Sequence, residues 1–340
     1  MKNSIIIAEA GVNHNGDIKL AKKLIDVASD AGADYVKFQS FKAKKLVSFK
    51  AKKAKYQSKN LKDNDDSQYN MLKKLELTDS EHLELFDYCS YKNIKFLSTA
   101  FDIDGLHYLD GLGLDFFKVP SGEITNYPFL KAVAEFNRPV ILSTGMSLID
   151  EISDAIDVLL KFGLTKDKIS ILHCNTEYPT PYNDVNLLAM HHLKERFETI
   201  IGYSDHTLGI EVSFAAVAIG AKIIEKHFTL SRSLSGPDHV SSLEPNELKE
   251  LVKGIRIIEK AISGDGKKKP SKSEIKNIAV ARKSIHLKNN LKINSIISED
   301  DLISLRPGDG ISPMEWNKII GQRINKDLEK YHKLSYNDLI

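Results

Sequence analysis

Two histidines in this chain stand where a metal ion could be held. His206 and His227 each follow a short apolar run, at 199–202 and 223–224. Two neutral imidazoles suit a divalent cation, although either histidine alone is more simply explained as a core residue. No third protein ligand is obvious. Coordination positions would then stay open for water or substrate, which is typical of a catalytic metal site.

Two lysines, Lys37 and Lys118, also follow short apolar runs. A lysine at the mouth of an apolar interior needs an anionic partner, because burying an unpaired charge is costly. A substrate phosphate or carboxylate would supply that partner. The alternative is a salt bridge to Glu9 or Glu123, and the two arrangements are compatible if they belong to the bound and the free protein.

Hydroxyl-bearing and glycine-rich turns add possible oxyanion donors. Ser121-Gly122-Glu123 and Ser143-Thr144-Gly145 each present hydroxyl and backbone N–H groups, although Ser-Gly pairs also occur simply as turn residues. Glu123 is a candidate general acid or base, with a structural hydrogen bond as the alternative role.

These residues share one position in the chain, because each follows an apolar run short enough to be a strand. The spacing between most runs leaves room for one helix. Eight such units predict an α/β fold, a (β/α)8 TIM barrel whose active site lies at the carboxyl ends of the strands. The runs cover residues 5–8, 35–36, 94–97, 116–117, 140–142, 169–172, 199–202 and 223–224.

Three stretches depart from this regular pattern. The polar segment 42–80 predicts a mobile loop or lid on the catalytic face, or equally a disordered surface insertion. Glycine, proline and lysines mark 266–281 as a linker after a catalytic domain at 1–265. Residues 282–340 then form a small module with a thin core, which is expected to lean on a partner surface.

The composition limits the class of protein. The 340 residues are 42% apolar and 28% charged, with a formal net charge of +2, so no global field favours nucleic acid. Neither a signal peptide nor a membrane span is expected, because no apolar run approaches the roughly 18 residues that a span needs. Cys89 and Cys174 are too few for a disulfide framework, so a cytoplasmic location is expected.

A set of motifs in order along nearly the whole chain resembles the bacterial sialic acid synthases. These enzymes condense phosphoenolpyruvate with an N-acetylated amino sugar. The matching stretches are 8–16 (AEAGVNHNG), 37–39 (KFQ), 118–123 (KVPSGE), 143–146 (STGM), 173–181 (HCNTEYPTP), 203–206 (YSDH), 225–229 (EKHFT), 235–239 (SGPDH), 281–284 (ARKS) and 306–313 (RPGDGISP).

The resemblance implies a TIM barrel joined to a small, mostly β, antifreeze-like (SAF) domain. It also implies a domain-swapped homodimer in which this domain caps the partner's active site. Arg306 would reach the sugar's N-acetyl group from the other subunit. His206 and His227 would bind the metal, usually Mn²⁺, with Mg²⁺ or Co²⁺ possible.

The resemblance further implies roles around the ligands. Glu9, Lys118, Glu123 and Arg306 would be catalytic, with Glu123 near the reacting carbons. Asn175 and Thr176 are alternatives for the residue that faces the ligand. Phosphoenolpyruvate would be held by Lys37, Thr99, Lys118, Ser121, Ser143, Asn175 and Ser204, and Glu9, Gln39, Tyr178 and Asp238 would line the sugar or metal side.

The implied reaction makes N-acetylneuraminate and phosphate from phosphoenolpyruvate, N-acetylmannosamine and water, with a metal-activated aldehyde and C–O cleavage. The alternative is legionaminate synthesis from 2,4-diacetamido-2,4,6-trideoxymannose. A non-catalytic carbohydrate-binding protein is the alternative from another class. The ring of polar residues at the strand ends argues against it, because a binding module needs no histidine pair beside paired lysines.

Overall fold

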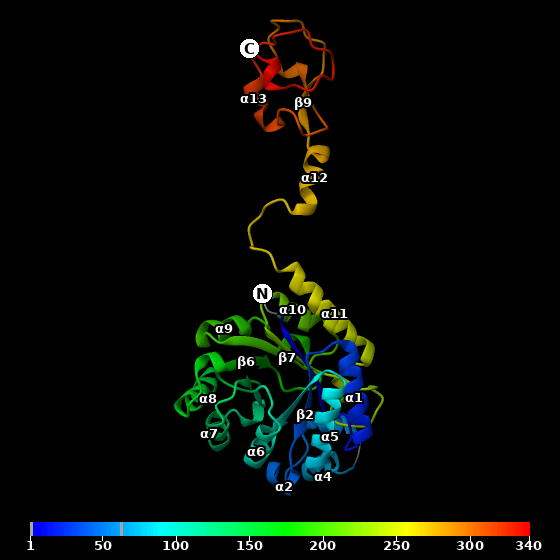
Figure 1. Ribbon diagram of the computed structural model, residues 1–340, viewed down its shortest axis with the longest axis vertical. Coiled ribbons are helices and arrows are strands. Elements are labelled where there is room, and N and C mark those ends of the chain that lie inside the picture. Colours follow the sequence, from blue (N-terminus) through cyan, green and yellow to red (C-terminus); the bar gives the residue numbers. More distant parts are fainter. Residues whose placement is uncertain (1–2, 62–63) are drawn as a thin grey trace. The chain divides into compact units, whose positions relative to one another are not determined.

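The computed structural model describes residues 3–61 and 64–340, which divide into one compact unit ending at Ser263 and another beginning at Gly264. In its described residues, the first unit contains eight parallel strands in the order β3-β2-β1-β8-β7-β6-β5-β4, with helices around them (Figure 1). Since β1 pairs with β8, the sheet curls into a nearly closed barrel, as predicted. The strands are β1 (Ile5–Gly11), β2 (Tyr35–Ser40), β3 (Lys95–Ala100), β4 (Phe117–Val119), β5 (Val140–Ser143), β6 (Ile169–Cys174), β7 (Ile200–Asp205) and β8 (Ile223–His227).

The strands form where the apolar runs stand, because both of their faces are covered. Ile6, Ile7 and Ala8 of β1 are all fully buried, which is typical of parallel strands beneath helices. Within the described residues, no helix is long and apolar enough to cross a bilayer. The surrounding helices are α1 (Ile18–Ala31), α5 (Asp79–Tyr91), α6 (Ile103–Gly111), α7 (Tyr127–Glu135), α8 (Ile149–Lys161), α9 (Ala189–Phe197), α10 (Glu211–Ala218) and α11 (Pro245–Ala261).

The segment after β2 is largely helical. It holds α2 (Ala43–Leu46), α3 (Lys55–Leu61) and α4 (Gln68–Leu75). Met71 and Leu75 of α4 pack with Val12 and Phe41 in a small separate core, so this part is no disordered insertion. Residues 62 and 63 of the expected loop lie outside the described residues.

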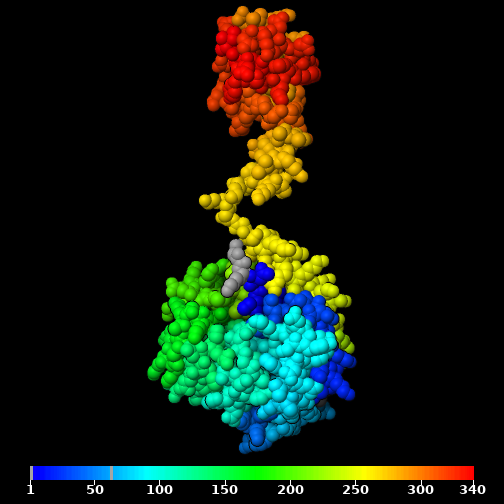
Figure 2. Space-filling view, viewed as in Figure 1, coloured from blue at the N-terminus to red at the C-terminus, as the bar shows by residue number. Residues whose placement is uncertain are grey.

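The second unit has its own small core. Strands β9 (Ser284–Leu287) and β10 (Leu302–Leu305) pair antiparallel, followed by the short helix α13 (Trp316–Ile319). The residues expected to form a linker include helix α12 (Lys272–Ala281), which begins at a capping box of Ser271 and Glu274. The residues after α12 fold into a small rounded body, orange and red in Figure 2, around Ile285, Leu287, Ile297, Leu302, Ile311, Ile319, Ile324, Leu328 and Leu334.

Candidate active site

A cluster of buried ion pairs lies at the carboxyl ends of the barrel strands. Lys37 Nζ lies 2.8 Å from Glu9 Oε2 and 3.6 Å from Glu225 Oε1. Lys118 Nζ lies 3.3 Å from the same Glu225 oxygen. Lys37 also donates to Thr99 Oγ1 at 3.2 Å. The side chains come from five different elements, β1, β2, β3, β4 and β8, and barrel closure brings them to one point.

The charged groups in this cluster shift one another's pKa values. Burial alone would raise the pKa of Glu225, but the ammonium groups of Lys118 and Lys37 outweigh it and hold the pKa at about 2. For Lys37, the carboxylates of Glu225 and Glu9 outweigh burial and raise the pKa. Burial lowers the pKa of Lys118, and the charge of Lys37 adds to this effect. Glu225 is therefore a permanent anion shared by two lysines.

The two predicted metal ligands lie beside this cluster. The ring centroids of His206 and His227 are 5.4 Å apart. His206 Nδ1 contacts the backbone oxygen of Asn175, so this nitrogen carries the proton and Nε2 keeps its lone pair. His227 Nδ1 is buried, has no hydrogen-bond partner among the described residues, and lies 3.9 Å from Asp238 Oδ2.

Burial also keeps both imidazoles neutral. It lowers the pKa of His206 to about 4. Burial, and then repulsion by His206, holds the pKa of His227 well below its ordinary value. The residues therefore fit a divalent cation, because neutral imidazole is the form that binds metal. Within residues 3–61 and 64–340, no group of three histidine, cysteine or acidic side chains is placed to hold a metal ion, so the fit rests on two protein ligands.

The two hydroxyl-bearing turns, at Ser121 and at 143–145, contact each other beside Cys174. Ser121 Oγ accepts a hydrogen bond of 2.9 Å from the backbone N–H of Gly145 and lies 3.3 Å from Cys174 Sγ. A Cβ at Gly145 would stand 2.7 Å from the methyl group of Thr176 and 2.9 Å from Ser121 Oγ. Only glycine therefore allows the turns after β4, β5 and β6 to approach this closely.

Other predicted residues link the two halves of the site. Ser204 Oγ donates to Glu225 Oε1 at 3.1 Å and lies 3.3 Å from His206 Nε2. Gln39 Nε2 donates to Glu9 Oε1 at 3.2 Å. Ser143, at the end of β5, is buried.

The aromatic ring of Tyr178 lies over the histidine pair. Its centroid is 4.1 Å from that of His206, with 29° between the ring planes, and 5.4 Å from that of His227. A second tyrosine, Tyr56 of α3, has its ring centroid 5.2 Å from that of Tyr178. Tyr56 was not among the predicted site residues, because it lies in a polar segment without hydrophobic periodicity.

Glu123 Oε2 accepts a hydrogen bond of 2.5 Å from Asn126 Nδ2, and in the described part of the chain Lys118 pairs with Glu225 rather than with Glu123. Glu225 was not among the predicted site residues. Its place two residues before His227 on β8 was a usable signal, because side chains two apart share one face of a strand.

Arg306 lies in the second unit, where its Nε donates to the backbone oxygen of Ala281.

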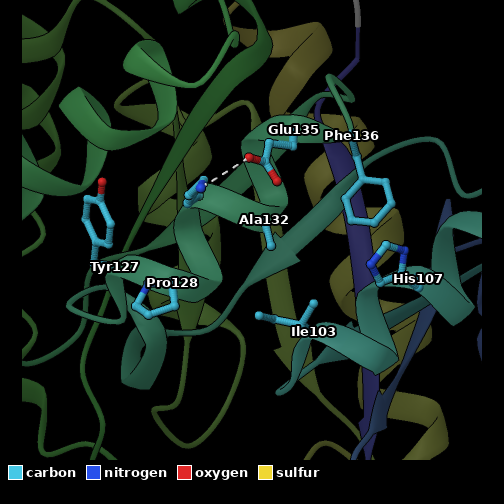
Figure 3. A pocket seen from close by; sticks show the side chains of 8 residues that line it. Ile103, His107, Tyr127, Pro128, Ala132, Glu135 and Phe136 are labelled. Atoms are coloured by element: carbon cyan, nitrogen blue, oxygen red, sulfur yellow. Dashed lines mark ion pairs between the residues drawn. The ribbon is translucent and has the colours of Figure 1, made fainter.

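A groove on the outer wall of the barrel is separate from these residues. Its volume is about 600 Å³, and Figure 3 shows it between α6 and α7, with Lys131 and Glu135 forming an ion pair of 3.7 Å. None of the predicted site residues lines it. Its lining is Ile103, His107, Tyr127, Pro128, Lys131, Ala132, Glu135 and Phe136.

Comparison with known proteins finds a matching family for each of the two units. Residues 24–268 match the NeuB family and residues 282–339 match the SAF domain. The chain is 55% identical to the N,N'-diacetyllegionaminic acid synthase of Campylobacter jejuni, over 97% of this chain and 98% of that protein. It is 47% identical to the enzyme of the same name from Legionella pneumophila, over 95% and 91% of the two chains.

A solved structure is similar as well. The N-acetylneuraminic acid synthetase of Leptospira borgpetersenii superposes with a TM-score of 0.70 at 39% identity, over 82% of this chain and 90% of that one. Family matches and sequence identity thus agree along both units. This chain therefore belongs to the NeuB family and carries a SAF domain at its carboxyl end.

Proposed function

We propose that this protein condenses phosphoenolpyruvate with an open-chain, N-acetylated amino sugar to give a nonulosonic acid and phosphate. The observation that carries the proposal is the pair of buried lysines, Lys37 and Lys118, that share Glu225 beside the neutral pair His206 and His227. One half of the site suits an anion, and the other would suit a divalent metal that could supply Lewis-acid chemistry to a carbonyl group.

The relatives favour one sugar over the other. Both of the bacterial relatives at 55% and 47% identity are named N,N'-diacetyllegionaminic acid synthase, whereas the human N-acetylneuraminate-9-phosphate synthase is 33% identical. We therefore propose 2,4-diacetamido-2,4,6-trideoxymannose as the substrate. N-acetylmannosamine, the first expectation from the sequence, is less well supported than this alternative.

The lysine half would hold phosphoenolpyruvate. Lys37 and Lys118 would neutralise its phosphate and carboxylate in a buried site, where electrostatic stabilisation is strong. The hydroxyl groups would supply further donors to the same anion. These groups belong to Thr99, Ser121, Ser143 and Ser204, with the side chain of Asn175 or Thr176 completing the set.

The histidine half would hold the sugar aldehyde. His206 and His227 would bind the divalent metal, for which Mn²⁺ is the first candidate and Mg²⁺ and Co²⁺ are alternatives. A bound metal would act as a Lewis acid on the aldehyde oxygen. Gln39, Tyr178 and Asp238 would orient the sugar, and Glu9 and Glu123 are the candidates for moving protons.

The bond changes balance without a redox partner. C3 of phosphoenolpyruvate bonds to the aldehyde carbon, whose oxygen gains a proton. Water adds to C2 and loses one proton, which leaves a hydroxyl there. The C2–O bond to phosphate then breaks, and the hydroxyl proton passes to the departing phosphate, so that C2 becomes a ketone. Lys37 and Lys118 would match the anionic charge from bound substrate to departing phosphate.

The second unit would complete the site. We propose a domain-swapped homodimer in which Arg306 of one subunit reaches the sugar's N-acetyl group in the barrel of the other. A guanidinium suits this task because its donors are fixed in one plane. The proposed reactants and products are small soluble molecules, in keeping with an enzyme of the cytoplasm.

The experiment is a coupled assay of the purified protein with phosphoenolpyruvate, Mn²⁺ and the diacetamido sugar. We expect equal amounts of phosphate and of a nine-carbon keto acid, identified by mass spectrometry. Binding of the sugar without phosphate release would instead favour the non-catalytic carbohydrate-binding protein.

A further inference from the structure

Helix α3 contacts the site, and its last residue, Leu61, packs partly buried against the small separate core that includes Met71 of α4. It has no buried residue, and its bounds fall within the polar segment after β2. Tyr56 at its start lies against Tyr178, and Asn60 Nδ2 donates to the backbone oxygen of Pro237 at 2.6 Å. Pro237 immediately precedes Asp238. These two contacts place α3 against the loops that follow β6 and β8, on the histidine side of the site.

A continuous series of rings runs from α3 to the histidine pair. The Tyr56 and Tyr178 rings are 5.2 Å apart with 30° between their planes, and Tyr178 stacks on His206 at 4.1 Å. Burial, with the nearby carboxylate of Asp238, raises the pKa of Tyr56, so its hydroxyl stays neutral. Tyr56 therefore adds an uncharged aromatic layer to this side of the site.

We infer that Tyr56 is a specificity-determining residue for the sugar, which acts as a positioning residue by holding Tyr178 against His206. This inference rests on the proposed function. An aromatic wall favours a substrate that presents methyl groups rather than hydroxyls. A 2,4-diacetamido-2,4,6-trideoxy sugar presents a C6 methyl and two acetamido methyls, whereas N-acetylmannosamine has hydroxyls at C4 and C6.

The same geometry predicts that loss of the Tyr56 ring does not change the binding of phosphoenolpyruvate. The contacts of the lysine half run through Lys37, Lys118 and Ser121, which come from β2, β4 and the turn after β4. The contacts of α3 described above are made to the histidine half. Because Tyr56 is only partly buried and is not a member of the barrel core or of the small core beside it, loss of its ring is also expected to change the thermal unfolding temperature little.

The test measures KM for each substrate in Y56A, Y56F and the control Y69A. Tyr69 of α4 belongs to the same segment and packs on the exposed Phe49 at 4.5 Å, so its removal is a matched loss of a ring pair. For Y56A we expect KM for the diacetamido sugar to rise about three- to tenfold, which is the fold-change in affinity expected for the loss of one aromatic pair. We expect an unchanged KM for phosphoenolpyruvate and a smaller preference over N-acetylmannosamine.

Y56F should behave as the wild type, because it keeps the ring, and Y69A should change neither KM. An unchanged sugar KM in an active Y56A enzyme would overturn the role of Tyr56 while leaving the proposed function intact. Equal rises of both KM values, or equal losses in Y56A and Y56F, would also overturn it. A wild-type protein that turns over neither sugar would overturn the proposed function, and this inference with it.

Discussion

The ε-ammonium group of Lys118 lies 3.3 Å from a carboxylate oxygen of Glu225, and both side chains are almost completely buried. The same oxygen lies 3.6 Å from the ammonium group of Lys37, while the other oxygen of Glu225 is buried and has no hydrogen-bond partner within residues 3–61 and 64–340. Two cations thus share one strongly acidic carboxylate. The lysines keep capacity for a second anion, which is what a phosphorylated, carboxylated substrate would require.

Replacing Lys118 by methionine tests this anion site. K118M keeps the length of the side chain and removes its charge, while Glu225 keeps Lys37 as a partner. We expect kcat/KM for phosphoenolpyruvate to fall about 10²- to 10³-fold, as for the loss of one buried oxyanion donor. K131M, on the outer helix α7, is the matched control and should be unaffected. Activity of K118M within twofold of the wild type would contradict the assignment.

Replacing His206 by alanine tests the metal site. Changing an outer-shell partner commonly weakens metal binding 10- to 100-fold, so loss of a ligand should weaken Mn²⁺ binding at least about 100-fold. The measurement is calorimetric titration of the metal-free protein with Mn²⁺, so it does not depend on turnover. H192A removes an exposed histidine of α9 and serves as the control. Equal Mn²⁺ affinity in H206A and the wild type would remove His206 from the site.

A chain that ends at Ser263 tests the role of the second unit. The barrel and the SAF domain have separate cores, so the shortened protein should fold and unfold cooperatively. It should nevertheless release no phosphate, because Arg306 is missing. The full-length R306A variant should keep the dimer, measured by light scattering, and lose sugar binding. An active, monomeric barrel fragment would refute the proposed contribution of the second subunit.

Stability should fall in mild acid because of buried neutral histidines. Burial lowers the pKa of His14 and of His239 to about 4, whereas an unfolded histidine titrates near 6.5. The unfolded chain therefore binds more protons as the pH falls, and the folded state loses about 2 kcal/mol per histidine between pH 7 and pH 5. Urea unfolding followed by circular dichroism should show this loss, and H239Q should show a smaller one. The same pH dependence in H239Q and the wild type would contradict the assignment to His239.

The barrel could be predicted because each of its strands can be recognised from a few neighbouring residues. Each strand is a short apolar run, and parallel strands buried on both faces need no other pattern. The polar residues after the runs then fall at one end of the barrel by topology alone. This is why Glu9, Lys37 and Lys118 could be named as site residues from their positions in the chain.

The remaining features depend on contacts that sequence spacing does not express. Glu225 is the counter-ion of two lysines from β2 and β4, and Glu123 had been a nearer candidate along the chain. Tyr56 reaches Tyr178 from a segment whose composition predicts only a loop. Helix α12 was predicted as part of a linker, because the glycine, proline and lysine residues before it are typical of linkers. Its capping box favours a helix, but this signal is weaker than the composition around it.

The most direct measurement compares kcat/KM for phosphate release from phosphoenolpyruvate and Mn²⁺ with each of the two sugars. We predict a higher value with 2,4-diacetamido-2,4,6-trideoxymannose than with N-acetylmannosamine, and a nine-carbon product that carries both acetamido groups. A higher value with N-acetylmannosamine would contradict the proposed substrate. Absence of phosphate release with either sugar would contradict the condensation reaction itself.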